Sequence, residues 1–279
     1  MTAWVKSVLA AATFGLLAAP ALAQQSETIT VTGRRELPTP VARRFVRQIT
    51  TSVDGQLTRF NEPVCPLAIG IDDPYAKMIA RRIRQVAADA KVRLAPEKCR
   101  ANVVVIFAAD ADALVKLMRV KAPELFEGVD DVKEAFRSGP VHAWTATEIR
   151  NEDGEVQKGT VLTVKTASII TMPTQQVILG TMIVIDSKAA MGKSLRQIAD
   201  YAAVRALTGA RPPEESVPAD TVLTLFNPAV ESPPQLTSVD RSYLRALYTG
   251  NANYARIDAI NRISAQIARE SKKDSAKRR

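Results

Sequence analysis

Two apolar runs joined by one amphipathic segment constrain the fold of this 279-residue chain more than any other feature. Residues 67–71 and 102–108 (NVVVIFA) are typical of buried strands. Residues 74–91 between them carry apolar side chains at helical spacing, at Met78, Ile79, Ile83, Val86 and Ala90. A strand, a helix and a strand of these lengths predict a βαβ unit, in which the two strands run parallel.

Residues 1–23 have the pattern of a secretory signal peptide. Lys6 precedes an apolar stretch over residues 8–19, and Ala21-Leu22-Ala23 matches a processing site, which predicts cleavage near Ala23. The alternative is an uncleaved membrane anchor, but the stretch is shorter than the ~18 residues that a spanning helix needs. No later apolar run reaches that length. We therefore expect an exported protein, periplasmic or secreted, with no transmembrane segment after signal cleavage.

Cys65 and Cys99 are the only cysteines in the chain, and each lies just before one of the two predicted parallel strands. Parallel neighbours begin at the same end of a sheet, so the predicted topology brings the two cysteines together. An oxidising compartment also favours their pairing. The sequence predicts a Cys65–Cys99 disulfide, and two buried thiols are the alternative.

The remaining chain contains further predicted strands and helices, and their order favours a mixed sheet. Residues 141–150, 158–170 and 176–185 are predicted strands, with a turn signal at 151–154. Helices are expected at the ranges 41–53, 110–120, 194–207, 237–248 and 254–269, and an extended segment at TVLTLF. The predicted fold class is α/β (α+β), a mixed sheet with a parallel βαβ unit and an antiparallel hairpin, flanked by helices.

Domain boundaries follow from composition and charge. We expect a flexible N-terminal segment at 24–40, a single α/β domain at 41–268 and a basic disordered tail at 269–279. The formal net charge is +9, but residues 24–47 carry five Arg against two Glu, and residues 269–279 carry six cations against two acids. Basic ends of this kind are usually solvated, with attraction to an anionic surface as the alternative. No nucleic-acid recognition motif is present, so no specific nucleic-acid partner is expected.

The segment 177–209 resembles two catalytic elements and lacks the key residues of both. A P-loop requires G-x-x-x-x-G-K-[ST], but Ser187 occupies the position of the first glycine before Gly192-Lys193-Ser194. Ser194 with Gln197 instead forms the pattern of a capping box at a helix start. A zinc protease requires H-E-x-x-H. Alanines stand at the three corresponding positions, Ala202, Ala203 and Ala206, and His142 is the only histidine.

The helix predicted at 194–207 has two distinguishable faces. Small and apolar side chains share the face expected to contact the sheet, namely Leu195, Ile198, Ala199, Ala202 and Ala206. Gln197, Tyr201 and Arg205 form a second row at i, i+4 and i+8. We interpret this row as a solvated or hydrogen-bonded face, with contact to a ligand as the alternative.

The order of elements, with the segments LRQIADYAAVRAL, TVLTLF and LTSVDRSYLRALY, resembles a group of exported bacterial proteins of uncharacterised function. These proteins have a distantly zincin-like layout, and the resemblance covers roughly residues 40–250. It implies a zincin-like fold. The alanines noted above depart from the ligand pattern of that fold, and this departure puts metal-dependent catalysis in doubt.

Three functional hypotheses follow. The first is a non-catalytic exported α/β module, of degenerate zincin-like type, that binds an unknown envelope protein or another envelope component. The second is a metal-independent envelope hydrolase that uses His142 with the helix face of Asp200, Tyr201 and Arg205. The third is a module that associates with an anionic surface through its basic ends. No cofactor and no metal are expected.

Overall fold

A computed structural model describes residues 36–156, 171–215 and 219–276, all within one compact unit, Arg34–Arg279. The predicted signal peptide at 1–23 and the predicted strand at 158–170 lie outside the described residues. So does the predicted flexible segment at 24–40, except for its last five residues.

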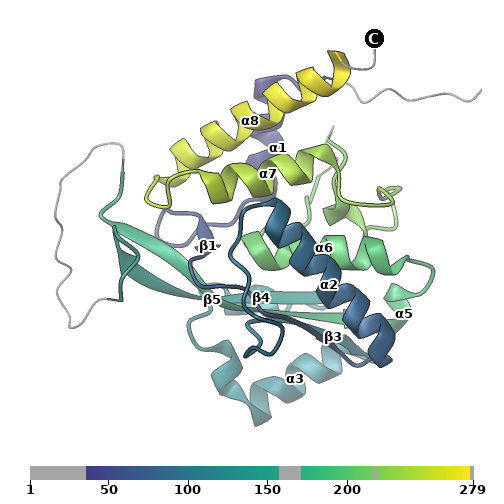
Figure 1. Ribbon diagram of the computed structural model, residues 1–279. Coiled ribbons are helices and arrows are strands. Elements are labelled where there is room, and N and C mark those ends of the chain that lie inside the picture. The colour runs from purple at the N-terminus through teal and green to yellow at the C-terminus, as the bar shows by residue number, and fades with distance from the viewer. Residues whose placement is uncertain (1–35, 157–170, 216–218, 277–279) are drawn as a thin grey trace, which may run out of the picture. The chain divides into compact units, whose positions relative to one another are not determined.

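A mixed sheet organises the described chain (Figure 1). Its strands are β1 (Thr58–Phe60), β2 (Pro66–Ile69), β3 (Val103–Ala108), β4 (Val141–Asn151) and β5 (Thr174–Asp186). β5 is the longest strand and the centre of the sheet. Along one edge it pairs in parallel with β1 and β3, and along the other it pairs antiparallel with β4. β2 completes the sheet beside β3.

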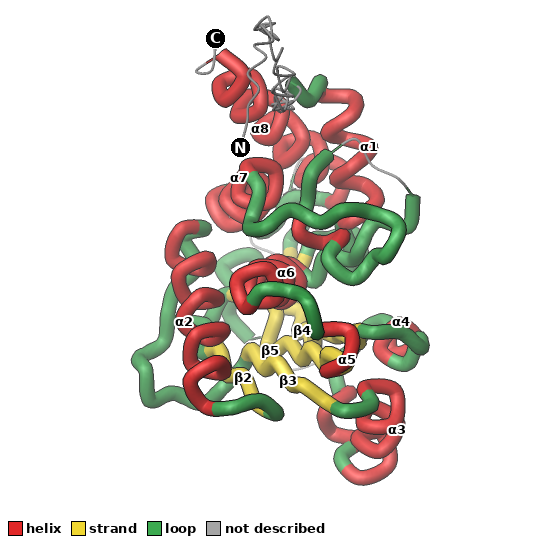
Figure 2. Tube along the Cα trace, turned by 90° about the vertical axis from the view of Figure 1, so that its right-hand side faces the viewer, coloured by secondary structure: helices red, strands yellow, loops and turns green. Residues whose placement is uncertain are grey.

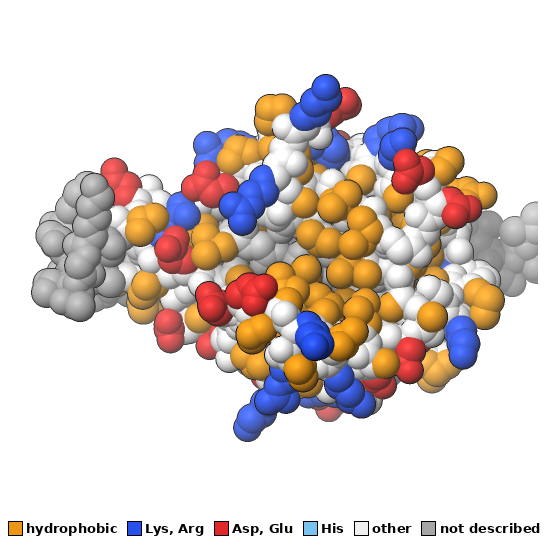
Figure 3. Space-filling view, turned by 90° about the horizontal axis from the view of Figure 1, so that it is seen from below, with side chains coloured by type: hydrophobic (Ala, Val, Ile, Leu, Met, Phe, Trp, Pro, Cys, Tyr) orange, Lys and Arg blue, Asp and Glu red, His pale blue; other side chains and the backbone are white. Residues whose placement is uncertain are grey.

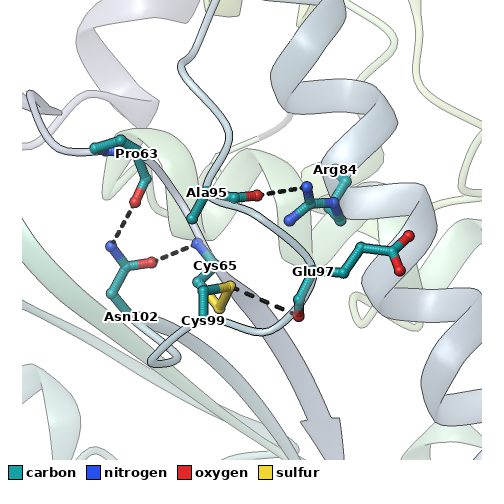
Figure 4. The surroundings of a disulfide bond; sticks show 7 residues. All are labelled: Pro63, Cys65, Arg84, Ala95, Glu97, Cys99 and Asn102. Atoms are coloured by element: carbon teal, nitrogen blue, oxygen red, sulfur yellow. Dashed lines mark hydrogen bonds between the residues drawn. A yellow bond between two sulfur atoms is a disulfide. The ribbon is translucent and has the colours of Figure 1, made fainter.

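The predicted βαβ unit is confirmed. β2, α2 (Asp73–Asp89) and β3 follow one another, and Pro66 pairs in parallel with Val103 at the start of both strands. Cys65 and Cys99 form a disulfide at this end, with their Cα atoms 6.1 Å apart (Figure 4). Asn102 supports the same corner, since its Oδ1 accepts from the Cys65 N–H at 2.7 Å.

Helices flank both faces of the sheet, as predicted for the mixed α/β class. The remaining helices are α1 (Thr39–Ile49), α3 (Ala111–Lys121), α4 (Val132–Ala135), α5 (Ser187–Ala190), α6 (Leu195–Thr208), α7 (Ser238–Thr249) and α8 (Arg256–Ala276), with short 3-10 turns η1 (Pro123–Phe126) and η2 (Val222–Thr224). α2 and α6 cover one face of the sheet and α3 lies on the other. α1, α7 and α8 form a further layer beyond α6 (Figure 2).

Three local predictions were wrong, two of them because a tertiary contact overrides the local pattern. TVLTLF is not extended: Asp240 accepts from the Val222 N–H and holds the 3-10 turn η2. Residues 269–276 are helical rather than a disordered tail. α8 continues because Ile263 and Ile267 are buried and the Leu37 N–H donates to Ser271 on its last turns. α1 ends at Ile49 rather than residue 53.

The start of α6 is as the sequence predicts. Ser194 accepts from the Gln197 N–H, Gln197 reaches back to the Ser194 N–H, and Gly192 has φ +77° in the turn before them. The second row is solvated or hydrogen-bonded only at Gln197, which is half-buried and donates to the Pro233 carbonyl; Tyr201 and Arg205 are buried. Every residue from Ile198 to Thr208 is buried, because the sheet covers one side of α6 and the outer helix layer covers the other.

The opposite face of the sheet is only partly covered. Leu67, Val104 and Met182 stand in register across β2, β3 and β5, and Leu67 at the β2 edge remains 43% exposed. α3 protects the other end of the sheet. Figure 3 shows hydrophobic side chains gathered in the middle of this face, with charged side chains around them. None of the helices in the described ranges is both long and apolar enough to span a bilayer.

Candidate functional site

His142 lies on the side of the sheet that faces α3. Its register partner Val184 belongs to the apolar cluster beneath α3, whereas the next pair along β4, Ala143 and Ile183, faces α6. His142 Nδ1 donates to the Ala135 carbonyl at 2.9 Å, and Nε2 lies 2.9 Å from Asp112 Oδ1. Because side chains alternate across a strand, the sheet separates His142 from the α6 row.

Asp200 is a structural carboxylate. It is fully buried and pairs with Arg82 of α2, with Nε 2.6 Å from Oδ1. Its other oxygen accepts from the Leu236 N–H at 2.6 Å. These bonds join α6 to α2 and to the segment that precedes α7, so this carboxylate has no free oxygen to offer a substrate.

Tyr201 is equally enclosed. It is 1% exposed and meets the Phe226 ring edge-on, with ring centroids 4.9 Å apart. Burial raises the pKa of its phenol. The structure therefore does not bring His142, Asp200, Tyr201 and Arg205 into one site. This removes the geometric basis of the hydrolase that the sequence suggested.

Arg205 alone of these four candidates reaches a cleft. It is 7% exposed, yet its guanidinium makes no hydrogen bond or ion pair to any residue in the described ranges. The guanidinium does face the Tyr201 ring, 5.8 Å from the centroid. The cleft has a volume of about 400 Å³ and opens between the end of α1, strand β4, the end of α6 and the turn that carries Asp131 and Glu134. We call it the Arg205 cleft.

Hydroxyl groups converge in the Arg205 cleft around Gly209, the residue that ends α6. Gly209 has φ +64°, and a Cβ at this position would lie 3.2, 3.5 and 3.8 Å from the Oγ1 atoms of Thr51, Thr58 and Thr145. These hydroxyls come from the loop after α1, from β1 and from β4. Glycine suits the left-handed conformation and also leaves this polar surface uncovered.

Carboxylates line the rim of the cleft. Asp131 accepts from Arg211 at 2.7 Å, and this hydrogen bond holds the pKa of Asp131 below its usual value. Glu134 lies 2.8 Å from Arg137, and Glu214 lies 3.8 Å from the same guanidinium. Asp131 therefore stays ionised and is poorly suited to act as a general acid.

The chemistry of the Arg205 cleft is that of binding. The unpaired guanidinium, with the Thr58 hydroxyl in the same cleft, offers hydrogen-bond donors to a carboxylate or phosphate oxygen. Within the described parts of the chain, no group of three or more His, Cys, Asp or Glu side chains is placed to hold a metal ion. The sequence pointed to Arg205 through its place in the i+4 row. The threonines and the acidic turn come from distant segments and carried no shared signal.

Comparisons with known protein families, with curated protein sequences and with solved structures found no match to this chain. The zincin-like resemblance therefore stays a prediction. The Arg205 cleft is the feature from which a function can be inferred.

Proposed function

We propose that this chain is an exported, non-catalytic binding protein that holds a small anionic ligand in the Arg205 cleft. The Arg205 guanidinium faces the cleft without a carboxylate partner, so in the free protein its charge is shielded from most of the solvent and is balanced only by the Tyr201 ring. A ligand carboxylate or phosphate would supply the missing acceptor.

The main support for the proposal is a comparison of two buried arginines. Arg150 and Arg205 are the two arginines, within the described ranges, that are less than a tenth exposed. Arg150 donates to both Glu62 and Glu148, at 2.9 and 3.0 Å. Arg205 pairs with no carboxylate of the described chain. The fold satisfies one buried arginine and leaves the other directed at a cleft, which is the arrangement expected of a ligand-binding group.

Other features support the remaining parts of the proposal. The Cys65–Cys99 disulfide is typical of exported proteins, and residues 1–23 have the pattern of a signal peptide. The absence of catalysis is supported by the position of the single histidine across the sheet and by the pairing of Asp131 with arginine. N-terminal sequencing of the exported protein tests the export signal, with Gln24 expected as the first residue.

The test of Arg205 is the variant R205M measured beside R150M. Methionine removes the charge and keeps much of the apolar stem. R205M should raise the free energy of unfolding of the ligand-free protein, by roughly 1 kcal/mol, because an uncompensated buried charge is lost. R150M should lower it by about 1–3 kcal/mol, because charged hydrogen bonds are broken.

Ligand binding provides the second readout. The thermal stability of each protein is measured with four anions and compared with chloride at equal ionic strength. The anions are acetate, succinate, citrate and inorganic phosphate. At least one should stabilise the wild type and R150M but not R205M. A destabilised R205M, or anion stabilisation that survives in R205M, would show that Arg205 is structural and would overturn the proposal.

A further inference from the structure

Gln48 lies in the wall of the Arg205 cleft and carries a buried oxygen that lacks a hydrogen-bond donor, whereas Arg205 lacks an acceptor. Gln48 Nε2 donates to Glu215 at 3.1 Å, which fixes the orientation of the amide. Gln48 Oε1 is buried and accepts no hydrogen bond from the described residues. A buried acceptor without a donor is unfavourable in the same way as a buried donor without an acceptor. The wall of the cleft therefore contains an acceptor without a donor as well as a donor group without an acceptor.

The carboxylates on the rim of the cleft also favour a positively charged group on the ligand. Four carboxylates line the cleft, those of Asp130, Asp131, Glu134 and Glu214. Two guanidiniums, Arg211 and Arg137, pair with three of them. Asp130 makes no hydrogen bond or ion pair with the described residues. The rim thus carries surplus negative charge, while Arg205 leaves the interior with an unpaired positive charge.

We propose that the ligand of the Arg205 cleft is a small zwitterion, with its carboxylate on Arg205 and its ammonium group toward Asp130 and the other carboxylates of the rim. Free amino acids and short peptides form this chemical class. The inference rests on the proposed function, since it requires that Arg205 binds an anion.

The dimensions of the cleft agree with such a ligand. A volume of about 400 Å³ lies within the range of roughly 300–1,000 Å³ that is common for small-molecule sites. The charged ends of a zwitterion match a site that is cationic inside and anionic at its mouth. A simple anion would satisfy Arg205 but would meet the repulsion of the rim carboxylates, so it should bind more weakly than a zwitterion with the same carboxylate.

Three matched peptide pools test the charge requirement. The first is a mixture of free dipeptides and tripeptides, the second contains the same peptides N-acetylated, and the third contains them as C-terminal amides. Thermal stabilisation and competition calorimetry should rank the free peptides first, with affinity for the acetylated pool lower by roughly tenfold. The amides should not bind, because Arg205 then has no carboxylate partner.

Two variants test whether the ammonium group of the ligand lies at the rim of the cleft. D130N keeps the size of the side chain and removes its charge, so it should weaken binding of the free peptides and leave binding of the acetylated pool unchanged. E127Q is the matched control, because Glu127 is an exposed acid of the same loop that does not line the cleft. It should change neither affinity.

The outcomes separate the two proposals. Equal binding of the free and acetylated pools, or no effect of D130N, overturns the zwitterion and leaves anion binding by Arg205 standing. Preferential binding of the amides overturns both proposals, because the carboxylate is then not recognised. Binding of no pool at millimolar concentration overturns the zwitterion, and the proposed function is then decided by the simple anions.

Discussion

Reduction of the Cys65–Cys99 bridge should destabilise the protein by an amount that follows from its position in the sequence. The two cysteines are 34 residues apart, and the closed loop contains β2 and α2. In the chain-entropy model, a loop of this length lowers the entropy of the unfolded chain by about 12.6 cal/mol/K, which corresponds to about 3.8 kcal/mol at 25 °C. The native state should change little, because the parallel pairing of β2 with β3 and the bond from Cys65 N–H to Asn102 persist without the bridge.

Urea unfolding with and without a phosphine reductant measures this difference. The double variant with Cys65→Ala and Cys99→Ala is the control, since the reductant should not affect it. We expect a lower midpoint in the reduced protein and unchanged near-UV circular dichroism at low urea. A loss below about 1 kcal/mol, or a changed native spectrum, would refute the reasoning from loop closure. In the first case the unfolded chain is already compact, and in the second the bridge shapes the native state.

Three further predictions follow from single contacts. R82M leaves Asp200 fully buried without its ion-pair partner and should cost about 3–5 kcal/mol in urea unfolding, whereas a loss below about 1 kcal/mol would contradict the pairing. G70A should lower the free energy of unfolding more than G55A does in the same assay. Gly70 has φ +83°, and its Cβ would lie 2.1 Å from a backbone oxygen of β3. Gly55 has φ +75° but nothing within 4 Å of its Cβ position, so G55A should lower it by only about 1–2 kcal/mol. Burial raises the pKa of Tyr243 to about 12, so the stability present below pH 10 should fall by about 2 kcal/mol as the pH rises from 10 to 12, since the unfolded phenol ionises first. Y243F should remove that part of the pH dependence, and an unchanged slope would count against it.

The sequence predicted those elements whose causes lie within a few residues. The capping box of Ser194 with Gln197 depends on a spacing of three residues, so the order of the residues is enough to indicate the start of α6. The βαβ unit was predictable for a similar reason. Its apolar runs have the lengths of buried strands, and a helix connects them, which leaves a parallel arrangement as the expected one.

The candidate site depended on contacts that the sequence does not encode locally. The periodicity of α6 distinguished Arg205 from the apolar face, but it also suggested a solvated row. Tyr201 and Arg205 are buried instead, because the outer layer of helices covers that side of α6, whereas Gln197 is hydrogen-bonded, as the same interpretation allows. Likewise, the hydrolase hypothesis places His142 beside Asp200, Tyr201 and Arg205, whereas strand pairing puts it on the opposite face of the sheet.

By itself, the sequence determined the class of fold and the start of α6, because both follow from short-range spacing and from the periodicity of apolar side chains. It also predicted the disulfide from the strand topology, with two buried thiols as the alternative. Only the tertiary structure decided which buried charges find partners. Asp200 meets Arg82 across 118 residues, and Arg150 meets Glu62 across 88. Arg205 meets no carboxylate of the described chain, and this difference depends on long-range packing, since its neighbours in the cleft come from segments far apart in the sequence.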